Sequence, residues 1–114
     1  MAYENIIYEK RDHIAYLTFN RPERRNAIDP PTQIETWNAL NDFRNDNDSW
    51  VVILTGTGDQ AFCAGADLKW RTENPDESPP WESNYQSDIN RIGPAGALPT
   101  EIWKPMIAAV NGFA

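Results

Sequence analysis

The chain has 114 residues, which leaves room for one domain at most. Its formal net charge of −7 argues against a general nucleic-acid binder or a protein that docks on anionic membranes, because both need a basic surface. Cys63 is the single cysteine and has no internal disulfide partner, and the N-terminus lacks the basic and apolar regions of a signal peptide. We therefore expect a cytoplasmic protein whose partners include neither nucleic acid nor membrane.

The first part of the chain predicts a β-hairpin followed by a helix. Residues 3–8 and 13–19 are rich in β-formers, and the charged tetrad 9–12 separates them. The second strand ends before Pro22, because proline cannot donate to a β-ladder. Asp29 then suits the N-cap of a helix that begins at Pro30. Apolar residues recur through this helix at helical spacing, namely Ile34, Trp37, Leu40 and Phe43.

The second part predicts two strands on either side of an irregular segment. Residues 50–55 form a short apolar run, typical of a buried strand in an α/β fold. Residues 72–96 are polar and proline-rich and predict a mobile loop, with one helix around 83–92. A helical turn over 98–103 and a buried strand over 106–110 follow. The expected fold class is α/β.

Residues 56–61 also satisfy the G-x-G-x-x-G/A pattern of dinucleotide-binding proteins, directly after a predicted strand. That pattern binds pyrophosphate only where its last position opens a long helix. Residues 62–66 do not resemble a helix start, and the acidic residue about 20 positions on, Asp76, lies in the proline-rich segment. A plain turn is therefore the favoured interpretation.

Four segments in a fixed order carry a family resemblance. They are residues 20–28 (NRPERRNAI), 51–56 (VVILTG), 61–68 (AFCAGADL) and 103–112 (WKPMIAAVNG). Together they resemble the enoyl-CoA hydratase/isomerase (crotonase) superfamily. The resemblance implies a spiral of β-β-α units, of which residues 1–114 would be the N-terminal portion of a single domain.

The resemblance also implies a reaction, in which two backbone N–H groups hold the carbonyl oxygen of an acyl-CoA thioester. Preorganised donors of this kind stabilise the negative charge of an enolate. By its position after Gly65, Ala66 is expected to supply the first N–H, at the start of a helix that begins with Asp67 or Leu68. The second donor and the acid/base carboxylates of the family fall beyond residue 114, so the chain is expected to be part of a longer protein.

The family's binding site for coenzyme A maps onto the loop at 23–27 and the segment 64–69. Arg21, Arg24 and Arg25 follow one strand, and Lys69 and Arg71 follow another, so basic groups are available for the phosphates. Lys69 matches a phosphate-contacting lysine of family members, whereas Glu23 stands where some members have a basic residue. The expected substrate-binding residues are Arg24, Arg25, Ala27, Ala64, Ala66, Asp67, Leu68 and Lys69.

Several reactions share this oxyanion hole. Hydration of a 2-enoyl-CoA is the leading hypothesis, and isomerisation, dehydration of a hydroxyacyl-CoA and decarboxylation are alternatives. A further alternative is a catalytically silent module for binding or assembly. The resemblance implies a trimer or a dimer of trimers for the full-length protein, and it implies no cofactor besides the coenzyme A of the substrate. No metal-ligand spacing occurs, so no metal is predicted.

The other reactive side chains near these segments have simpler interpretations. Asp67 is expected to cap a helix rather than act as a base, and Cys63 to be a buried spacer rather than a nucleophile. His13 lies at the predicted hairpin turn and is not expected to be catalytic. Three tryptophans are candidates for lining an acyl pocket, with packing as their default role, namely Trp70, Trp81 and Trp103.

Overall fold

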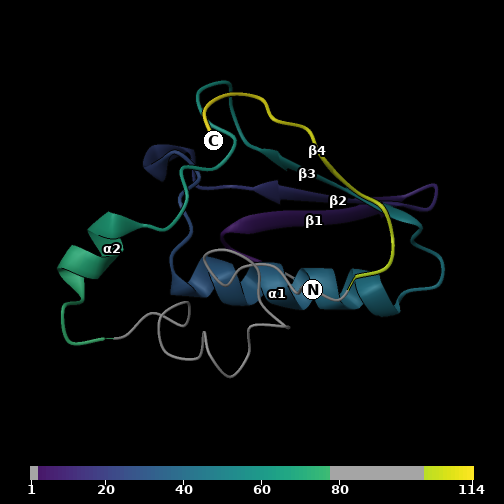
Figure 1. Ribbon diagram of the computed structural model, residues 1–114, viewed down its shortest axis with the longest axis horizontal. Helices are drawn as coiled ribbons and strands as arrows, with labels where there is room; N and C mark the ends of the chain where they lie inside the picture. Colours follow the sequence, from purple (N-terminus) through teal and green to yellow (C-terminus); the bar gives the residue numbers. More distant parts are fainter. Residues whose placement is uncertain (1–2, 78–101) are drawn as a thin grey trace.

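The computed structural model describes residues 3–77 and 102–114, and it confirms the α/β class. A single sheet holds four strands in the order β1-β2-β3-β4, as Figure 1 shows. The hairpin strands pair antiparallel, and the remaining pairs are parallel. The strands are β1 (Ile6–Arg11), β2 (Ile14–Phe19), β3 (Val51–Gly56) and β4 (Met106–Ala108).

The predicted hairpin is confirmed, but its turn is shorter than the charged tetrad suggested. Strand β1 continues to Arg11 and pairs with Ile14, so only Asp12 and His13 form the turn. Both have positive φ, 51° and 69°, as a two-residue turn between twisted strands requires. Glu9–Arg11 were misassigned because charged residues are depleted in strands in general, although an edge strand accommodates them.

Helix α1 (Pro30–Asn45) provides the crossover between the parallel strands β2 and β3. Asp29 caps it as predicted, because its side chain accepts a hydrogen bond from the Thr32 N–H. The buried face differs from the apolar spacing, since Ile34 is 56% exposed. The side chains that α1 buries are Thr32, Gln33, Thr36, Ala39, Leu40 and Phe43.

The core lies between α1 and one face of the sheet, and Figure 1 shows the helix running along that face. Because side chains alternate along a strand, every second residue of β2 and β3 points into this core. The buried cluster consists of Ile6, Ala15, Leu17, Phe19, Ile28, Ala39, Leu40, Phe43, Val52 and Leu54.

The C-terminal strand β4 is an edge strand rather than the buried strand expected over 106–110, and Ile107 is 53% exposed. Lys104, just before it, reaches the end of α1 and donates to three carbonyl oxygens. The acceptors are Phe43 O at 2.6 Å, Asp46 O at 2.5 Å and Ser49 O at 2.7 Å. These bonds tie the C-terminal segment to the helix.

Part of the predicted loop is helical instead. Helix α2 (Leu68–Glu73) includes Thr72 and Glu73, which were expected to be loop. The helix predicted around 83–92 lies outside the described residues, as does most of the turn predicted over 98–103, and Ile102 and Trp103 are not helical. No helix in the described ranges is long and apolar enough to cross a membrane.

Candidate functional site

The segment after β3 bends sharply and lies beside the short helix η1 (Pro22–Arg24) and the residues that follow it. Gly56 is required here, because a Cβ at this position would lie 2.3 Å from Phe62 O and 2.7 Å from Asn26 Nδ2. The buried Asn26 side chain donates to Thr57 O at 3.2 Å and to Ala61 O at 2.8 Å. Its oxygen accepts from the Arg21 N–H, so one amide fixes both sides of the bend.

Ala66 lies at the point where these two segments are bridged. The Ile28 N–H donates to Gly65 O at 2.7 Å, and Ile28 O accepts from the Asp67 N–H at 2.9 Å. In such a parallel bridge the residue between the two bonds directs its own N–H away from the partner strand. The Ala66 N–H accordingly makes no hydrogen bond with any described residue. It is a backbone donor held in a fixed direction.

Gly65 and Cys63 shape the approach to that donor. Gly65 has φ of +87°, a conformation that glycine adopts without strain. The Cys63 sulfur accepts weakly from the Gly65 N–H at 3.5 Å. Burial raises the pKa of the Cys63 thiol more than this bond lowers it. The thiol therefore stays protonated at neutral pH, which fits the predicted role as a spacer.

Asp67 caps α2, as predicted. One carboxylate oxygen accepts from the Trp70 N–H at 3.0 Å, and the other forms an ion pair with Arg21 at 3.0 Å. The residue is only 3% exposed. Burial acts to raise the pKa of Asp67, but the Trp70 N–H and the neighbouring guanidinium groups outweigh it, and the pKa lies below its usual value. A carboxylate held ionised in this way is poorly suited to act as a general base.

The basic residues expected to contact phosphates differ in their exposure and in their partners. Arg21 is only 8% exposed and is fully engaged inside the protein, so it is not available to a phosphate. Arg24 is half-buried between Asp67 and Glu73, each at 3.6 Å. Arg25 is exposed, as is Lys69, and neither side chain forms an ion pair within the described part of the chain.

The remaining predicted binding residues lie on the same two segments. Ala27 is buried, and its carbonyl accepts from Arg21. Ala64 donates its N–H to Arg25 O at 3.1 Å, and Leu68 opens α2 with its side chain 74% exposed. The structure thus brings the loop at 23–27 and the segment 64–69 side by side, as the resemblance implied.

A pocket of about 280 Å³ opens where η1 meets the bend. Its lining residues are Pro22, Arg25, Asn26, Thr57, Gly58, Asp59, Gln60 and Ala61. Six residues separate the last position of the dinucleotide pattern, Ala61, from the start of α2 at Leu68. The turn interpretation is therefore correct, because no helix begins where pyrophosphate binding requires one.

The other side chains singled out are one histidine and three tryptophans. His13 stacks on Trp50 with ring centroids 3.8 Å apart at the hairpin end of the sheet, and no role in catalysis is indicated. Trp103 is 95% exposed, so it neither packs in the core nor lines a pocket within the described residues. Trp70 is half-buried on α2, and Trp81 lies outside the described residues.

Two structural roles were not foreseen. Asn111 donates to Gly56 O at 2.6 Å and Gly58 O at 2.7 Å, and its oxygen accepts from the Gly56 N–H at 3.2 Å. Arg21 joins the two helix caps rather than meeting solvent. Both residues belong to segments that carry the family resemblance, which was the one available signal. Their partners are distant in the sequence, so spacing did not reveal them.

Three features characterise the structural class of this protein. They are the four-stranded sheet, the bend after β3 that is bridged to Ile28, and the small residues on either side of Ala66. A family model described as enoyl-CoA hydratase/isomerase matches residues 9–114. The chain belongs to the enoyl-CoA hydratase/isomerase family.

Individual relatives agree with this assignment. The chain is 36% identical over 109 residues to (E)-benzylidenesuccinyl-CoA hydratase of Thauera aromatica, covering 96% of this chain and 40% of that protein. It is 36% identical to crotonyl-CoA hydratase of Syntrophomonas wolfei subsp. wolfei, covering 100% and 42%. The crystal structure of carnitinyl-CoA hydratase from Mycobacterium avium superposes with a TM-score of 0.78 at 36% identity, over 97% of this chain and 40% of that one. The chain thus spans about 40% of the length of these relatives.

Proposed function

We propose that the full-length protein is an acyl-CoA enzyme that stabilises a thioester enolate, and that its reaction is the hydration of a 2-enoyl-CoA. The observation that carries this proposal is the Ala66 N–H, which is fixed by the Ile28 bridge and has no acceptor among the described residues. An oxyanion needs a donor that is already in place when charge develops. Helix α2 has only six residues, so its dipole contributes little to holding the oxyanion. The fixed direction of the Ala66 N–H contributes more.

The neighbouring groups suit the rest of a coenzyme A thioester. Arg25 and Lys69 are exposed cations on the two adjacent segments and carry no carboxylate partner in the described ranges. Arg24 is partly neutralised by Asp67 and Glu73, so its contribution to phosphate binding is smaller. We assign substrate contacts to Arg24, Arg25, Ala27, Ala64, Ala66, Leu68 and Lys69, and to the backbone of Asp67.

Hydration is favoured over the other reactions because the relatives named above are hydratases. Isomerisation, dehydration and decarboxylation use the same donor and differ in carboxylates that residues 1–114 do not supply. The proposal includes a trimer or a dimer of trimers in the cytoplasm, with no cofactor besides the coenzyme A of the substrate.

The experiment is turnover of crotonyl-CoA by the full-length protein and by two variants at one position. Ala66→Pro removes the N–H and is expected to lower kcat by about 10²–10³-fold, the usual loss for one oxyanion donor. Ala66→Ser keeps the N–H and serves as the matched control, with kcat expected within about 3-fold of the parent because a backbone donor depends little on its side chain. Unchanged turnover in the proline variant would contradict the proposal.

The 114-residue chain by itself has a second candidate function, as a silent binding or assembly module. It spans about 40% of the length of its relatives, and the acid/base carboxylates implied by the resemblance are not within it. Calorimetry with coenzyme A, run beside a turnover assay, separates the two candidates. Binding without turnover supports the module, and hydration by the 114-residue chain rules it out.

A further inference from the structure

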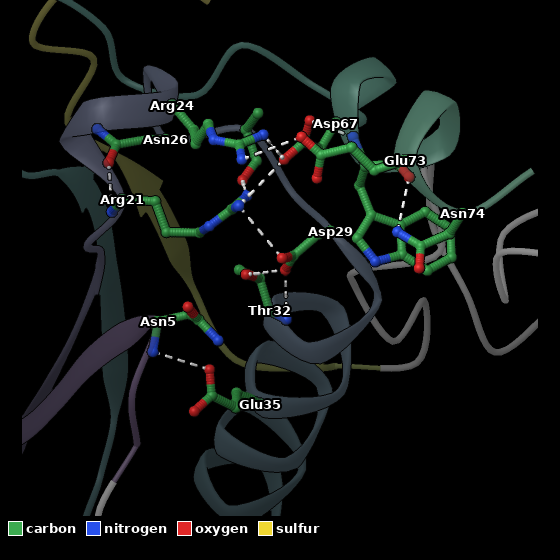
Figure 2. Close-up of polar contacts among 12 residues, drawn as sticks. Asn5, Arg21, Arg24, Asn26, Asp29, Thr32, Glu35, Asp67, Glu73 and Asn74 are labelled. Carbon is green, nitrogen blue, oxygen red and sulfur yellow. Dashed lines mark hydrogen bonds and ion pairs between the residues drawn. The ribbon is translucent and has the colours of Figure 1, made fainter.

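A buried guanidinium connects the N-caps of both helices, beside the peptide that carries the Ala66 N–H. Arg21 Nη2 lies 3.1 Å from a carboxylate oxygen of Asp29 and 3.0 Å from one of Asp67. Its Nη1 donates to Ala27 O at 2.5 Å. Figure 2 shows the side chain reaching between the two aspartates, and Arg24 meets the same oxygen of Asp67 at 3.6 Å.

Each bond of this guanidinium falls next to the bridge that orients Ala66. Ala27 precedes Ile28 and Asp29 follows it, and Asp67 follows Ala66, so Arg21 holds both neighbours of Ile28 and one neighbour of Ala66. Ile28 in turn binds the backbone on both sides of Ala66. The Ala66 peptide is thereby fixed by two backbone hydrogen bonds to Ile28. The Arg21 side chain connects the residues next to those bonds.

We propose that Arg21 is a positioning residue for the oxyanion donor and acts through Asp67 and the Ala27 carbonyl; this inference rests on the proposed function. The chemistry requires arginine because one planar group must meet three acceptors in fixed directions. Lysine carries the same charge on a single nitrogen and cannot bind the three acceptors in the same directions. A donor displaced by a fraction of an ångström loses contact with the oxyanion and leaves substrate affinity largely intact.

The two aspartates provide a matched pair of variants. Each uses one oxygen to cap a helix, at the N–H of Thr32 or Trp70, and the other oxygen to meet Arg21 Nη2. Asparagine retains the capping acceptor, so Asp29→Asn and Asp67→Asn each remove an ion pair with Arg21 without removing either cap. Asp67→Asn also removes the longer pair with Arg24, at 3.6 Å. They differ in place, because Asp67 is bonded to Ala66, whereas Asp29 caps α1 and is bonded to Ile28 on the other side of the bridge. Asp29→Asn keeps the contacts of Arg21 with Asp67 and with Ala27 O, through which the positioning acts.

The first experiment compares kcat and KM for crotonyl-CoA in these variants of the full-length protein. Asp67→Asn and Arg21→Lys are expected to lower kcat by about 10-fold or more and to change KM by less than about 3-fold. Asp29→Asn is expected to keep kcat within about 2-fold. Equal losses of kcat in the two asparagine variants would show that Arg21 only stabilises the fold and would overturn the inference.

A second readout does not depend on turnover. Amide hydrogen exchange at Ile28 and Asp67 reports the two bonds that flank Ala66. Exchange at both is expected to accelerate about 10-fold or more in Asp67→Asn and to change little in Asp29→Asn. If the parent protein turns over no enoyl-CoA, the proposed function fails, while this comparison still decides the positioning role: equal exchange rates overturn it, and selective acceleration supports it.

Discussion

At the scale of single residues, the site is built from side chains that satisfy backbone groups rather than from reactive side chains. Asn26 and Asn111 hold the bend after β3 from two sides, and Gly56 lets that bend approach closely. Asp67 has two tasks, since it caps α2 and neutralises Arg21. The spacing of Asp67 before a helix predicted its cap, but its partner lies 46 residues away and spacing does not predict such a pair.

The depressed pKa of Asp67 gives stability a predicted dependence on pH. Its native pKa lies below the unfolded value of about 3.9, so the ionised form stabilises the fold above that pH, and this contribution is lost as pH falls through the native pKa. Asp67→Asn should therefore be less stable than the parent at pH 7, and the difference should shrink below about pH 4. Urea unfolding of both proteins across this range measures it. A difference that is constant with pH would contradict the assignment.

At the scale of elements, local signals predicted most boundaries and tertiary contacts decided the rest. The cap at Asp29 and Pro30 located the start of α1, and the apolar run located β3. The exposed Ile34 departs from the expected pattern because α1 lies against only one face of the sheet and turns its small residue Ala39 toward it. Strand β1 extends through charged residues because it is an edge strand, and Lys10 also forms ion pairs with Asp42 and Asp46.

Lys104 joins the C-terminal segment to the end of α1, where backbone carbonyls lack partners within the helix. Lys104→Met keeps the apolar stem and removes the charge with its three hydrogen bonds, while Phe43 O and Asp46 O still accept from the N–H groups of Asp46 and Ser49. We expect the free energy of unfolding to fall by about 2–3 kcal/mol.

The matched control is Lys10→Met, which removes a lysine whose side chain is 40% exposed and pairs with the carboxylates of Asp42 and Asp46. Surface pairs contribute little, so a loss of about 1 kcal/mol or less is expected. Chemical denaturation of both variants provides the measurement. Equal losses would contradict the capping role of Lys104.

At the scale of the whole molecule, the described residues place helix α1 against one face of the sheet. Large apolar side chains remain exposed in the C-terminal segment, namely Trp103, Ile107, Val110 and Phe113. The chain spans about 40% of the length of its relatives.

The family resemblance indicated that the loop at 23–27 and the segment 64–69 lie close together. The hydropathy pattern alone did not predict this proximity. The sequence did not predict that Arg21 binds two aspartates inside the protein, because the number of charged residues does not show which of them pair.

The central claim is that the Ala66 N–H polarises the carbonyl of a bound thioester. The most direct test is the carbonyl stretching frequency of butyryl-CoA, labelled with ¹³C at the thioester carbon, bound to the full-length protein. An amide-to-ester exchange at Ala66 removes the N–H and keeps the side chain. We predict a frequency below the value in water for the parent protein and a partial return toward that value after the exchange. The same frequency in both proteins would contradict the claim.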